Sequence, residues 1–299
     1  MRRVGRARAA ICAFVATQVR GPVPTDRYAF LRSYDLFADA RHLPFRLEGD
    51  SSRAAVLVHG FPGTPADMRP LGDALHGVGW SVVAPLLPGF GPEIPTLPER
   101  KYSEWRDAIQ AAVADARPTY GRVVLVGHSL GAAVELLATE REPVDAQVLL
   151  APYWRFGGPL KSALWPVLRM WARRWKPLGN ANFDDERVRS GVLRMLPDLD
   201  LDDATVRAEL RRFTVPTRLL DELRRLGSAA RKAAERSSTR TLIVQGLRDV
   251  LVQPKDTDVL LKAIAGARLE LLDGTHNLTS PTDGAWGPVS RAVLGFLDE

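Results

Sequence analysis

Short apolar runs alternate with helix-like stretches along most of this chain. Strand-like runs occupy residues 44–48, 54–59, 81–84, 122–126, 146–151, 241–245 and 267–272. Continuous apolar runs of this length are typical of strands buried on both faces of a parallel sheet. Apolar residues recur at helical spacing over 68–78, 102–116, 130–140, 254–264 and 289–297. This order of elements predicts an α/β fold, with a mostly parallel central sheet and helices on both faces.

The alternation stops between residues 152 and 237, where no strand-like run occurs and the helical stretches are rich in tryptophan, arginine and leucine. Insertions of this kind often act as lids over a site. We therefore divide the chain into a basic N-terminal extension at 1–33, a first core segment at 34–151, a helical cap or lid at 152–237 and a second core segment at 238–299.

Composition places the chain among ordinary globular proteins, because 45% of its residues are hydrophobic and 25% are charged. Its net charge of +6 arises mainly before the first acidic residue, Asp26, and the remainder is nearly balanced. The sequence shows neither a basic stripe interleaved with aromatic residues nor the ligand spacing of a zinc site. We therefore expect no nucleic-acid partner and no metal. No apolar stretch approaches about 20 residues, so no transmembrane helix is expected.

The amino-terminal segment combines features of two kinds. An apolar stretch at 9–17 follows four arginines, as in the core of a signal peptide, but no A-x-A cleavage motif comes after it. The only cysteine, Cys12, excludes an internal disulfide and leaves the redox compartment open. We expect a basic extension on a cytoplasmic protein, with secretion as the alternative.

The motif Gly127-His128-Ser129-Leu130-Gly131 is the most informative part of the sequence. It has the form G-x-S-x-G, directly follows the apolar run 122–126 and precedes a helical pattern. In that context it predicts a nucleophile elbow, a sharp turn from strand to helix that holds the serine in a strained, accessible conformation. Side chains at either glycine would collide with neighbouring backbone. Ser129 is therefore the candidate nucleophile.

A serine hydroxyl needs a base within hydrogen-bond reach, and that base needs a third group to orient it. Proteins with this kind of elbow carry the three groups in the chain order serine, acid, histidine. Of the five histidines, only His276 lies downstream of Ser129. It falls in the loop after the strand 267–272, where the carboxyl end of a strand can approach the elbow. His276 is the candidate base.

Asp249 is the candidate acid, because it follows the strand 241–245 after a short turn. A carboxylate there can accept the second imidazole proton and fix the tautomer. Asp256 and Asp258 are alternatives, although both fall at the start of a predicted helix, where they would compensate its dipole. Asp273 is closer to His276 in sequence and is expected to shape the turn.

Acyl transfer also needs donors aimed at the oxygen that becomes negative in the tetrahedral intermediate. The candidates are the backbone N–H groups of Leu130, at the start of the helix, and Phe61, in the loop after His59. The adjacent Pro62 cannot donate. His59 is expected to anchor this oxyanion loop, and His128 is expected to pack the elbow.

These motifs resemble the α/β-hydrolase superfamily. They are, in order, Val58-His-Gly-Phe-Pro-Gly63, Pro88-Gly-Phe-Gly91, the elbow, Gln245-Gly-Leu-Arg-Asp249 and Thr275-His-Asn277. From about residue 44 to 297 the chain is similar to small bacterial carboxylesterases and monoacylglycerol-lipase-like enzymes. The resemblance implies a serine hydrolase without cofactor that cleaves carboxylic esters through an acyl-enzyme on Ser129. Phe90 departs from the pattern, because many relatives have histidine there, and is expected to alter the pocket rim.

Fold and triad do not select the leaving group or the acyl acceptor. Carbon–carbon bond hydrolysis, amide or peptide cleavage, perhydrolysis and acyl transfer therefore remain alternatives, and so does a binding protein that has kept the fold without turnover. Epoxide or haloalkane hydrolysis is disfavoured, because those related enzymes carry aspartate at the position of Ser129.

The predicted cap is the part of the sequence that bears on substrate specificity. Its apolar residues recur at helical spacing, and basic residues without an acidic one accompany them between 152 and 176. We expect the apolar stripe to cover the site, with Phe61, Trp154 and Trp165 binding the substrate. The expected partner is a small-molecule ester with an apolar acyl group. Contact of the cap with an anionic lipid interface is the alternative interpretation. The oligomeric state is not predicted.

Overall fold

The computed structural model describes residues 37, 39–50, 52–155, 174–196 and 199–299. The chain divides into two compact units. The first consists of Met1–Ala38, Pro92–Glu99 and Gly157–Asp221, and the second of Asp39–Gly91, Arg100–Phe156 and Glu222–Glu299. The boundaries expected for the extension, the core segments and the cap remain predictions. Every described candidate site residue belongs to the second unit.

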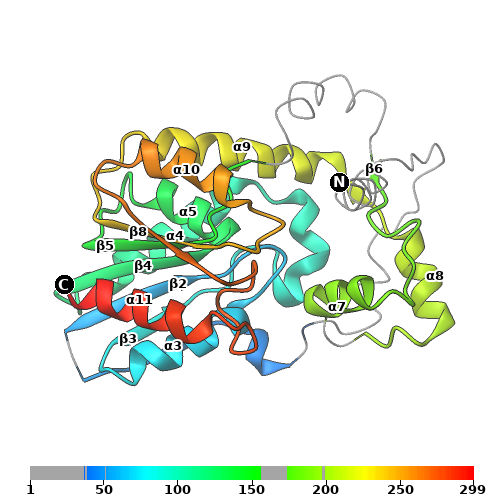
Figure 1. Ribbon diagram of the computed structural model, residues 1–299, viewed down its shortest axis with the longest axis horizontal. Helices are drawn as coiled ribbons and strands as arrows, with labels where there is room; N and C mark the ends of the chain where they lie inside the picture. Colours follow the sequence, from blue (N-terminus) through cyan, green and yellow to red (C-terminus); the bar gives the residue numbers. More distant parts are fainter. Residues whose placement is uncertain (1–36, 38, 51, 156–173, 197–198) are drawn as a thin grey trace. The chain divides into compact units, whose positions relative to one another are not determined.

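The second unit is built on a seven-stranded sheet with the order β1-β3-β2-β4-β5-β8-β9 (Figure 1). Its strands are β1 (Phe45–Leu47), β2 (Arg53–Val58), β3 (Ser81–Ala84), β4 (Arg122–His128), β5 (Ala146–Leu150), β8 (Thr241–Gly246) and β9 (Arg268–Leu272). All neighbouring pairs are parallel except β1 with β3, which is antiparallel. The prediction of a mostly parallel central sheet is confirmed.

Helices follow most of these strands and pack on the sheet. They are α3 (Arg69–His76), α4 (Tyr102–Ala116), α5 (Leu130–Ala138), α10 (Pro254–Ala263) and α11 (Trp286–Asp298). Short 3-10 helices occupy Ala40–His42, Pro65–Met68 and Gly91–Glu99. Helices α3 and α11 contact one another on one side of the sheet, and α5 and α10 lie on the other side (Figure 1). The core therefore surrounds the central strands.

The central helix α5 shows why the sheet can carry a site at this point. All of its residues are buried, and the neighbouring strands β5 and β8 are buried along their whole length. Each apolar side chain removed from water contributes roughly 1.5–3 kcal/mol. The turn between β4 and α5 is thus held between rigid elements, at the carboxyl edge of the sheet where active sites of such folds lie.

The first unit corrects one prediction from the sequence. Its described part contains α7 (Glu186–Met195), α8 (Ala204–Arg212) and an antiparallel pair of strands, β6 (Arg174–Trp175) with β7 (Val215–Pro216). The expectation that residues 152–237 contain no strand is therefore wrong. Both strands have only two residues, which is too short for an alternating pattern to appear. Helix α9 (Thr217–Ala234) contributes residues to both units.

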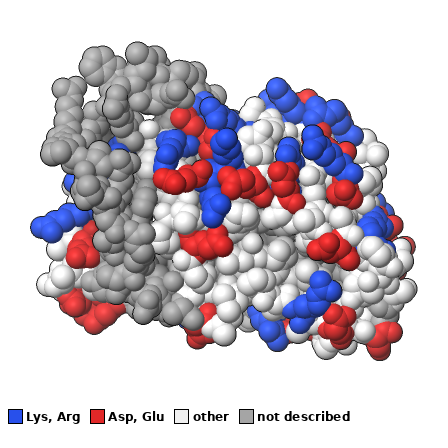
Figure 2. All heavy atoms as spheres, turned by 180° about the vertical axis from the view of Figure 1, so that it is seen from behind, with Lys and Arg blue, Asp and Glu red and all other residues white. Residues whose placement is uncertain are grey.

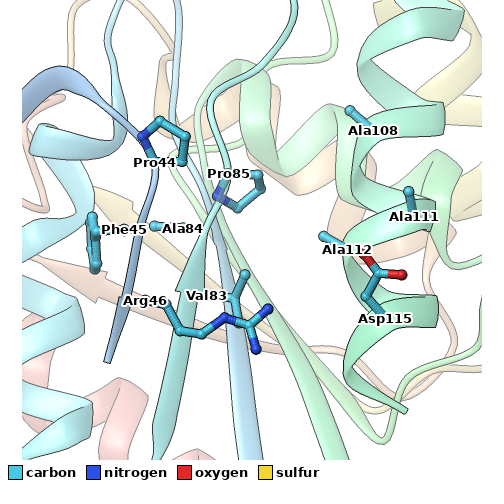
Figure 3. A pocket seen from close by; sticks show the side chains of 10 residues that line it. All are labelled: Pro44, Phe45, Arg46, Val83, Ala84, Pro85, Ala108, Ala111, Ala112 and Asp115. Carbon is cyan, nitrogen blue, oxygen red and sulfur yellow. The ribbon is translucent and has the colours of Figure 1, made fainter. Parts of the chain in front are cut away.

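A surface pocket of about 390 Å³ lies beside the edge of the sheet. Its lining comes from β1, from the end of β3 and from α4, whose small alanines leave the space open (Figure 3). Arg46 and Asp115 are the charged residues of this lining. None of the candidate catalytic residues lines the pocket, so it is separate from the candidate site.

Surface charge on the visible face is mixed, with lysine and arginine interspersed among aspartate and glutamate (Figure 2). Within the described part of the chain, no helix has the length and apolar character that crossing a membrane requires. The same residues contain no cluster of histidine, cysteine, aspartate and glutamate that could hold a metal ion.

Candidate active site

Ser129 alone separates strand β4 from helix α5. Its backbone has φ 54° and ψ −110°, a conformation that costs an L-residue about 1–3 kcal/mol. Two hydrogen bonds hold it there. The Ser129 N–H donates to the Leu150 carbonyl over 2.8 Å, and the Tyr153 N–H donates to the Ser129 carbonyl over 3.0 Å. Strand β5 and the loop after it therefore stabilise the turn, which has the predicted strain.

The two glycines of the motif have no room for a side chain. A Cβ atom on Gly131 would meet the Val58 carbonyl oxygen at the end of β2, and one on Gly127 would lie 2.6 Å from the Ala132 nitrogen. Both obstacles include backbone atoms, which cannot rotate out of the way. The predicted steric requirement for glycine is confirmed.

Gly131→Ala is therefore expected to lower the free energy of unfolding by about 1–3 kcal/mol, because β2 and α5 must separate to admit the methyl group. Gly295→Ala in α11 is the matched control, since a Cβ there meets nothing within 4 Å. The control should be more stable by about 0.5–1 kcal/mol, as helix propensity favours alanine. Urea unfolding of both variants checks this expectation, and equal shifts in the two would contradict it.

Three side chains from the loops after β4, β8 and β9 meet at the carboxyl edge of the sheet. The Nε2 atom of His276 lies 3.0 Å from Ser129 Oγ, and its Nδ1 atom lies 2.7 Å from Asp249 Oδ2. Parallel strands bring these loops to the same edge, although the three residues are far apart in sequence. The candidate nucleophile, base and acid are thus joined by hydrogen bonds.

The environment of Asp249 favours its ionised form. Burial of the carboxylate would raise its pKa, but the hydrogen bond and charge of His276 and two backbone amides lower the pKa below its usual value. Those amides belong to Leu251 and Val252 and donate to Oδ1 over 2.8 and 2.9 Å. Because the Asp249 carboxylate can accept only from a protonated Nδ1, it fixes the ring proton of neutral His276 on Nδ1. The unprotonated Nε2 then faces the serine hydroxyl.

The rival carboxylates have other partners or are exposed. Asp256 pairs with Arg155 in the first turn of α10. Asp273 is 80% exposed and pairs with Arg248 over 2.8 Å. Asp258 is exposed. Among the four carboxylates, Asp249 accepts the hydrogen bond from the imidazole.

Gln245, to which the sequence assigned no role, supports Asp249 from the end of β8. Its Nε2 donates to Asp249 Oδ2 over 3.3 Å and to the Val252 carbonyl over 2.9 Å. Its Oε1 accepts a 2.6 Å hydrogen bond from the Thr257 hydroxyl. The signal in the sequence is a buried-strand position with a polar residue, four residues before the acid.

His59 is fully buried and holds the loop after β2. Its Nδ1–H donates to the Gly60 carbonyl over 3.0 Å, and its Nε2 accepts the Leu87 N–H over 3.1 Å. Burial lowers the pKa of His59 to about 4, so the ring is neutral at pH 7. With both nitrogens engaged, His59 joins the loops after β2 and β3.

Phe90, which is expected from the sequence to alter the pocket rim, is fully buried rather than placed at a rim. Its ring makes edge contacts with His59, Phe61 and Trp105, at centroid distances of 5.1, 5.9 and 5.7 Å. The Phe90 ring therefore packs the loop that carries His59 and Phe61 against α4.

The loop that carries Phe61 lies against the elbow. A Cβ on Gly60 would be 3.3 Å from Ser129 Cβ. Phe61 itself is 39% exposed, and Leu130 is the buried first residue of α5, whose N–H lies outside the helical hydrogen-bond ladder. Their service as oxyanion donors remains a prediction.

Of the other predicted substrate-binding residues, Trp154 is half-buried, and its indole N–H donates to the Asp256 carbonyl over 2.7 Å. Trp165 lies outside the described residues. Substrate binding by Phe61, Trp154 and Trp165 remains a prediction.

Comparison with known proteins agrees with this architecture. The model of the alpha/beta hydrolase family matches residues 55–286, so the chain belongs to this family. It is 24% identical over 225 residues to a thermostable monoacylglycerol lipase of Bacillus sp. (strain H-257), covering 73% of this chain and 78% of that protein. It is 26% identical over 197 residues to esterase EstD of Thermotoga maritima, covering 64% of this chain and 44% of that protein.

Solved structures share the fold. One described as LipS and LipT, two metagenome-derived lipolytic enzymes, has a TM-score of 0.66 at 21% identity and covers 87% of this chain and 98% of its own. The monoacylglycerol lipase of Paleococcus ferrophilus has a TM-score of 0.62 at 19% identity and covers 85% of this chain and 97% of its own.

Proposed function

We propose that this protein is a serine hydrolase that cleaves carboxylic esters, in the manner of a carboxylesterase or a monoacylglycerol lipase. The observation that carries the proposal is the position of His276, which is hydrogen-bonded to Ser129 Oγ over 3.0 Å and to Asp249 Oδ2 over 2.7 Å. The names of the relatives, which are lipases and esterases, support the ester as the bond that is cleaved.

In the first half-reaction, Ser129 Oγ attacks the ester carbonyl carbon while His276 Nε2 takes the hydroxyl proton. Asp249 stabilises the imidazolium that forms. The oxyanion of the tetrahedral intermediate accepts hydrogen bonds from the N–H groups of Phe61 and Leu130, each worth about 3–4 kcal/mol. The imidazolium then protonates the leaving alkoxide as the carbon–oxygen bond breaks, which releases the alcohol and leaves the acyl group on Ser129.

In the second half-reaction, a water molecule replaces the alcohol. His276 takes a proton from the water as the water oxygen attacks the acyl carbon. It then returns that proton to Ser129 Oγ as the carboxylic acid product leaves. No redox or metal step is needed to balance the reaction. The cycle restores the serine hydroxyl and the neutral imidazole.

The substrate would be a small-molecule ester with an apolar acyl group, bound by Phe61, Trp154 and Trp165 beneath a lid formed from residues 152–237. The alternative contact of the cap with a lipid interface involves a basic segment that lies mostly outside the described residues. Both remain predictions, as does a cytoplasmic location.

A fluorophosphonate probe tests the proposal, because it reacts with a serine only where a base activates the hydroxyl. We expect one phosphonate per chain, found on Ser129 by peptide mass spectrometry and absent from Ser129→Ala. A panel of p-nitrophenyl esters of increasing chain length and matched anilides should show ester cleavage. Absence of labelling would favour the non-catalytic alternative, and preference for anilides would favour amide cleavage.

A further inference from the structure

His128, the last residue of β4, contacts the backbone of the candidate base. Its Nε2–H donates to the His276 carbonyl oxygen over 2.8 Å. The two imidazole rings lie 5.0 Å apart between centroids, at an angle of 46°. A side chain adjacent to the nucleophile therefore holds the main chain of the residue that takes the proton.

The ring of His128 is neutral and has one tautomer. Burial lowers the pKa of His128 to about 3, and the neighbouring His276 adds to this effect. Because a carbonyl oxygen can only accept, the single ring proton must lie on Nε2. Nδ1 lies on the side of the oxyanion loop, since a Cβ on Gly60 would be 3.2 Å from it. His128 thus lies between the oxyanion loop and the loop of residues 273–277, which carries His276 and is called the base loop below.

Other hydrogen bonds of the base loop hold the residues on either side of His276, and on the far side the Asn277 N–H donates to Thr275 Oγ1 over 3.2 Å. The Thr275 N–H donates to Asp283 Oδ2 over 3.0 Å, and the Gly274 carbonyl accepts the Arg248 N–H over 2.9 Å. The hydrogen bond that the His276 ring donates to Asp249 sets the tilt of the ring but does not hold its backbone. Within the described part of the chain, the hydrogen bond from His128 acts on the His276 main chain itself.

We propose that His128 is a positioning residue, which sets the distance between Ser129 Oγ and His276 Nε2 by tying the backbone of the base to the residue before the nucleophile. The inference rests on the proposed triad. His128 touches no reacting atom and transfers no proton. Misplacement of a reacting group by about 1 Å costs about 100-fold in rate, so a loosened base loop should lower kcat.

Two substitutions separate this role from simple packing. His128→Gln keeps an N–H donor at the end of the side chain, near the position of the imidazole Nε2, whereas His128→Leu is apolar and similar in size. We expect His128→Leu to lower kcat about 10- to 100-fold with KM within about threefold of the wild type. The rate of fluorophosphonate labelling should fall by a similar factor, and His128→Gln should recover most of both rates.

Thermal unfolding of both variants gives melting temperatures, against which the losses in kcat are compared. Wild-type kcat in His128→Leu would overturn the proposal, and so would equal losses in the two variants that follow their melting temperatures. If His128→Leu does not fold, His128→Met serves as the donor-free variant and is held to the same outcomes. Failure of the proposed function itself is seen separately, as ester turnover that persists in Ser129→Ala.

Discussion

Replacing Ser129 by alanine is expected to lower kcat for ester hydrolysis by about 10⁶-fold, because the change removes the oxygen that forms the acyl-enzyme. A residual acceleration of about 10³- to 10⁴-fold over water should remain from oxyanion stabilisation and binding. Alanine keeps a Cβ at the positive φ of 54°, so the strain and the free energy of unfolding should change little. Steady-state kinetics and urea unfolding measure the two quantities.

Two further serine variants provide controls. Ser103→Ala in α4 removes a hydroxyl that belongs to none of the candidate catalytic groups and should leave kcat unchanged. Ser129→Gly should be as inactive as Ser129→Ala, yet more stable by up to about 1 kcal/mol, because glycine adopts positive φ without a steric penalty. Turnover of Ser129→Ala at more than a few per cent of the wild-type rate would contradict the assignment of the nucleophile.

The second large effect, on the pH dependence of stability, is expected at Glu135, a fully buried residue of α5. Neither of its carboxyl oxygens has a hydrogen-bond partner among the described residues. Burial raises the pKa of Glu135 well above its usual value of 4.5. The carboxyl lies against Gly127, directly beneath the elbow. Ionisation of Glu135 would thus place a negative charge in the buried core beneath the elbow.

The raised pKa means that the folded protein retains this proton at pH values where the unfolded chain has lost it. The protonated Glu135 carboxyl therefore makes its full contribution to the free energy of unfolding below about pH 4.5. This contribution is lost as pH rises toward the pKa of Glu135 in the folded protein. Over that range the loss is up to about 1.4 kcal/mol per pH unit. Glu135→Gln cannot ionise and should match the wild type near pH 4 but exceed its stability at pH 8.

Urea unfolding from pH 4 to pH 9 measures the difference between the two proteins at each pH. The buried histidines His59 and His128 act in the opposite direction, because their lowered pKa values make stability fall as pH drops below about 6.5. They are present in both proteins and cancel in the comparison. Glu270→Gln on the exposed edge strand β9 is the matched control, for which parallel profiles are expected. Parallel profiles for Glu135→Gln would contradict the prediction.

Local patterns predicted most of the sheet and its helices. Helix α4 has the bounds expected from the spacing of Trp105, Ile109 and Val113, all of which are buried. Helix α3 is shorter than expected, because Met68 ends a separate 3-10 helix and the α-helix stops at His76, with Gly77 as its C-cap. Strands β6 and β7 were missed, since two residues leave no detectable alternation. Periodicity thus succeeds where an element is long enough to present a buried face.

Some residues of the candidate site are likewise predictable from the sequence, whereas others need the structure. Ser129 follows from the motif, and His276 follows from the chain order, because it is the only histidine after the elbow. The sequence favours Asp249 by its place after a strand and assigns Asp256 and Asp258 to a helix start and Asp273 to a turn. In the structure, Asp249 accepts the hydrogen bond from the imidazole over 2.7 Å. Their catalytic roles stay predictions, which the serine variants and the fluorophosphonate probe test.

The sequence by itself determined the order of strands and helices and the sharp turn at Ser129, because periodicity and the steric demand for glycine act between residues close along the chain. The tertiary structure alone decided the proton positions on His59 and His128, the burial of Glu135 and the contact of His128 with the base loop. Those properties depend on burial and on distances between separate segments, 28 residues apart for His59 and Leu87 and 148 residues apart for His128 and His276. Such distances exist only once the sheet has assembled.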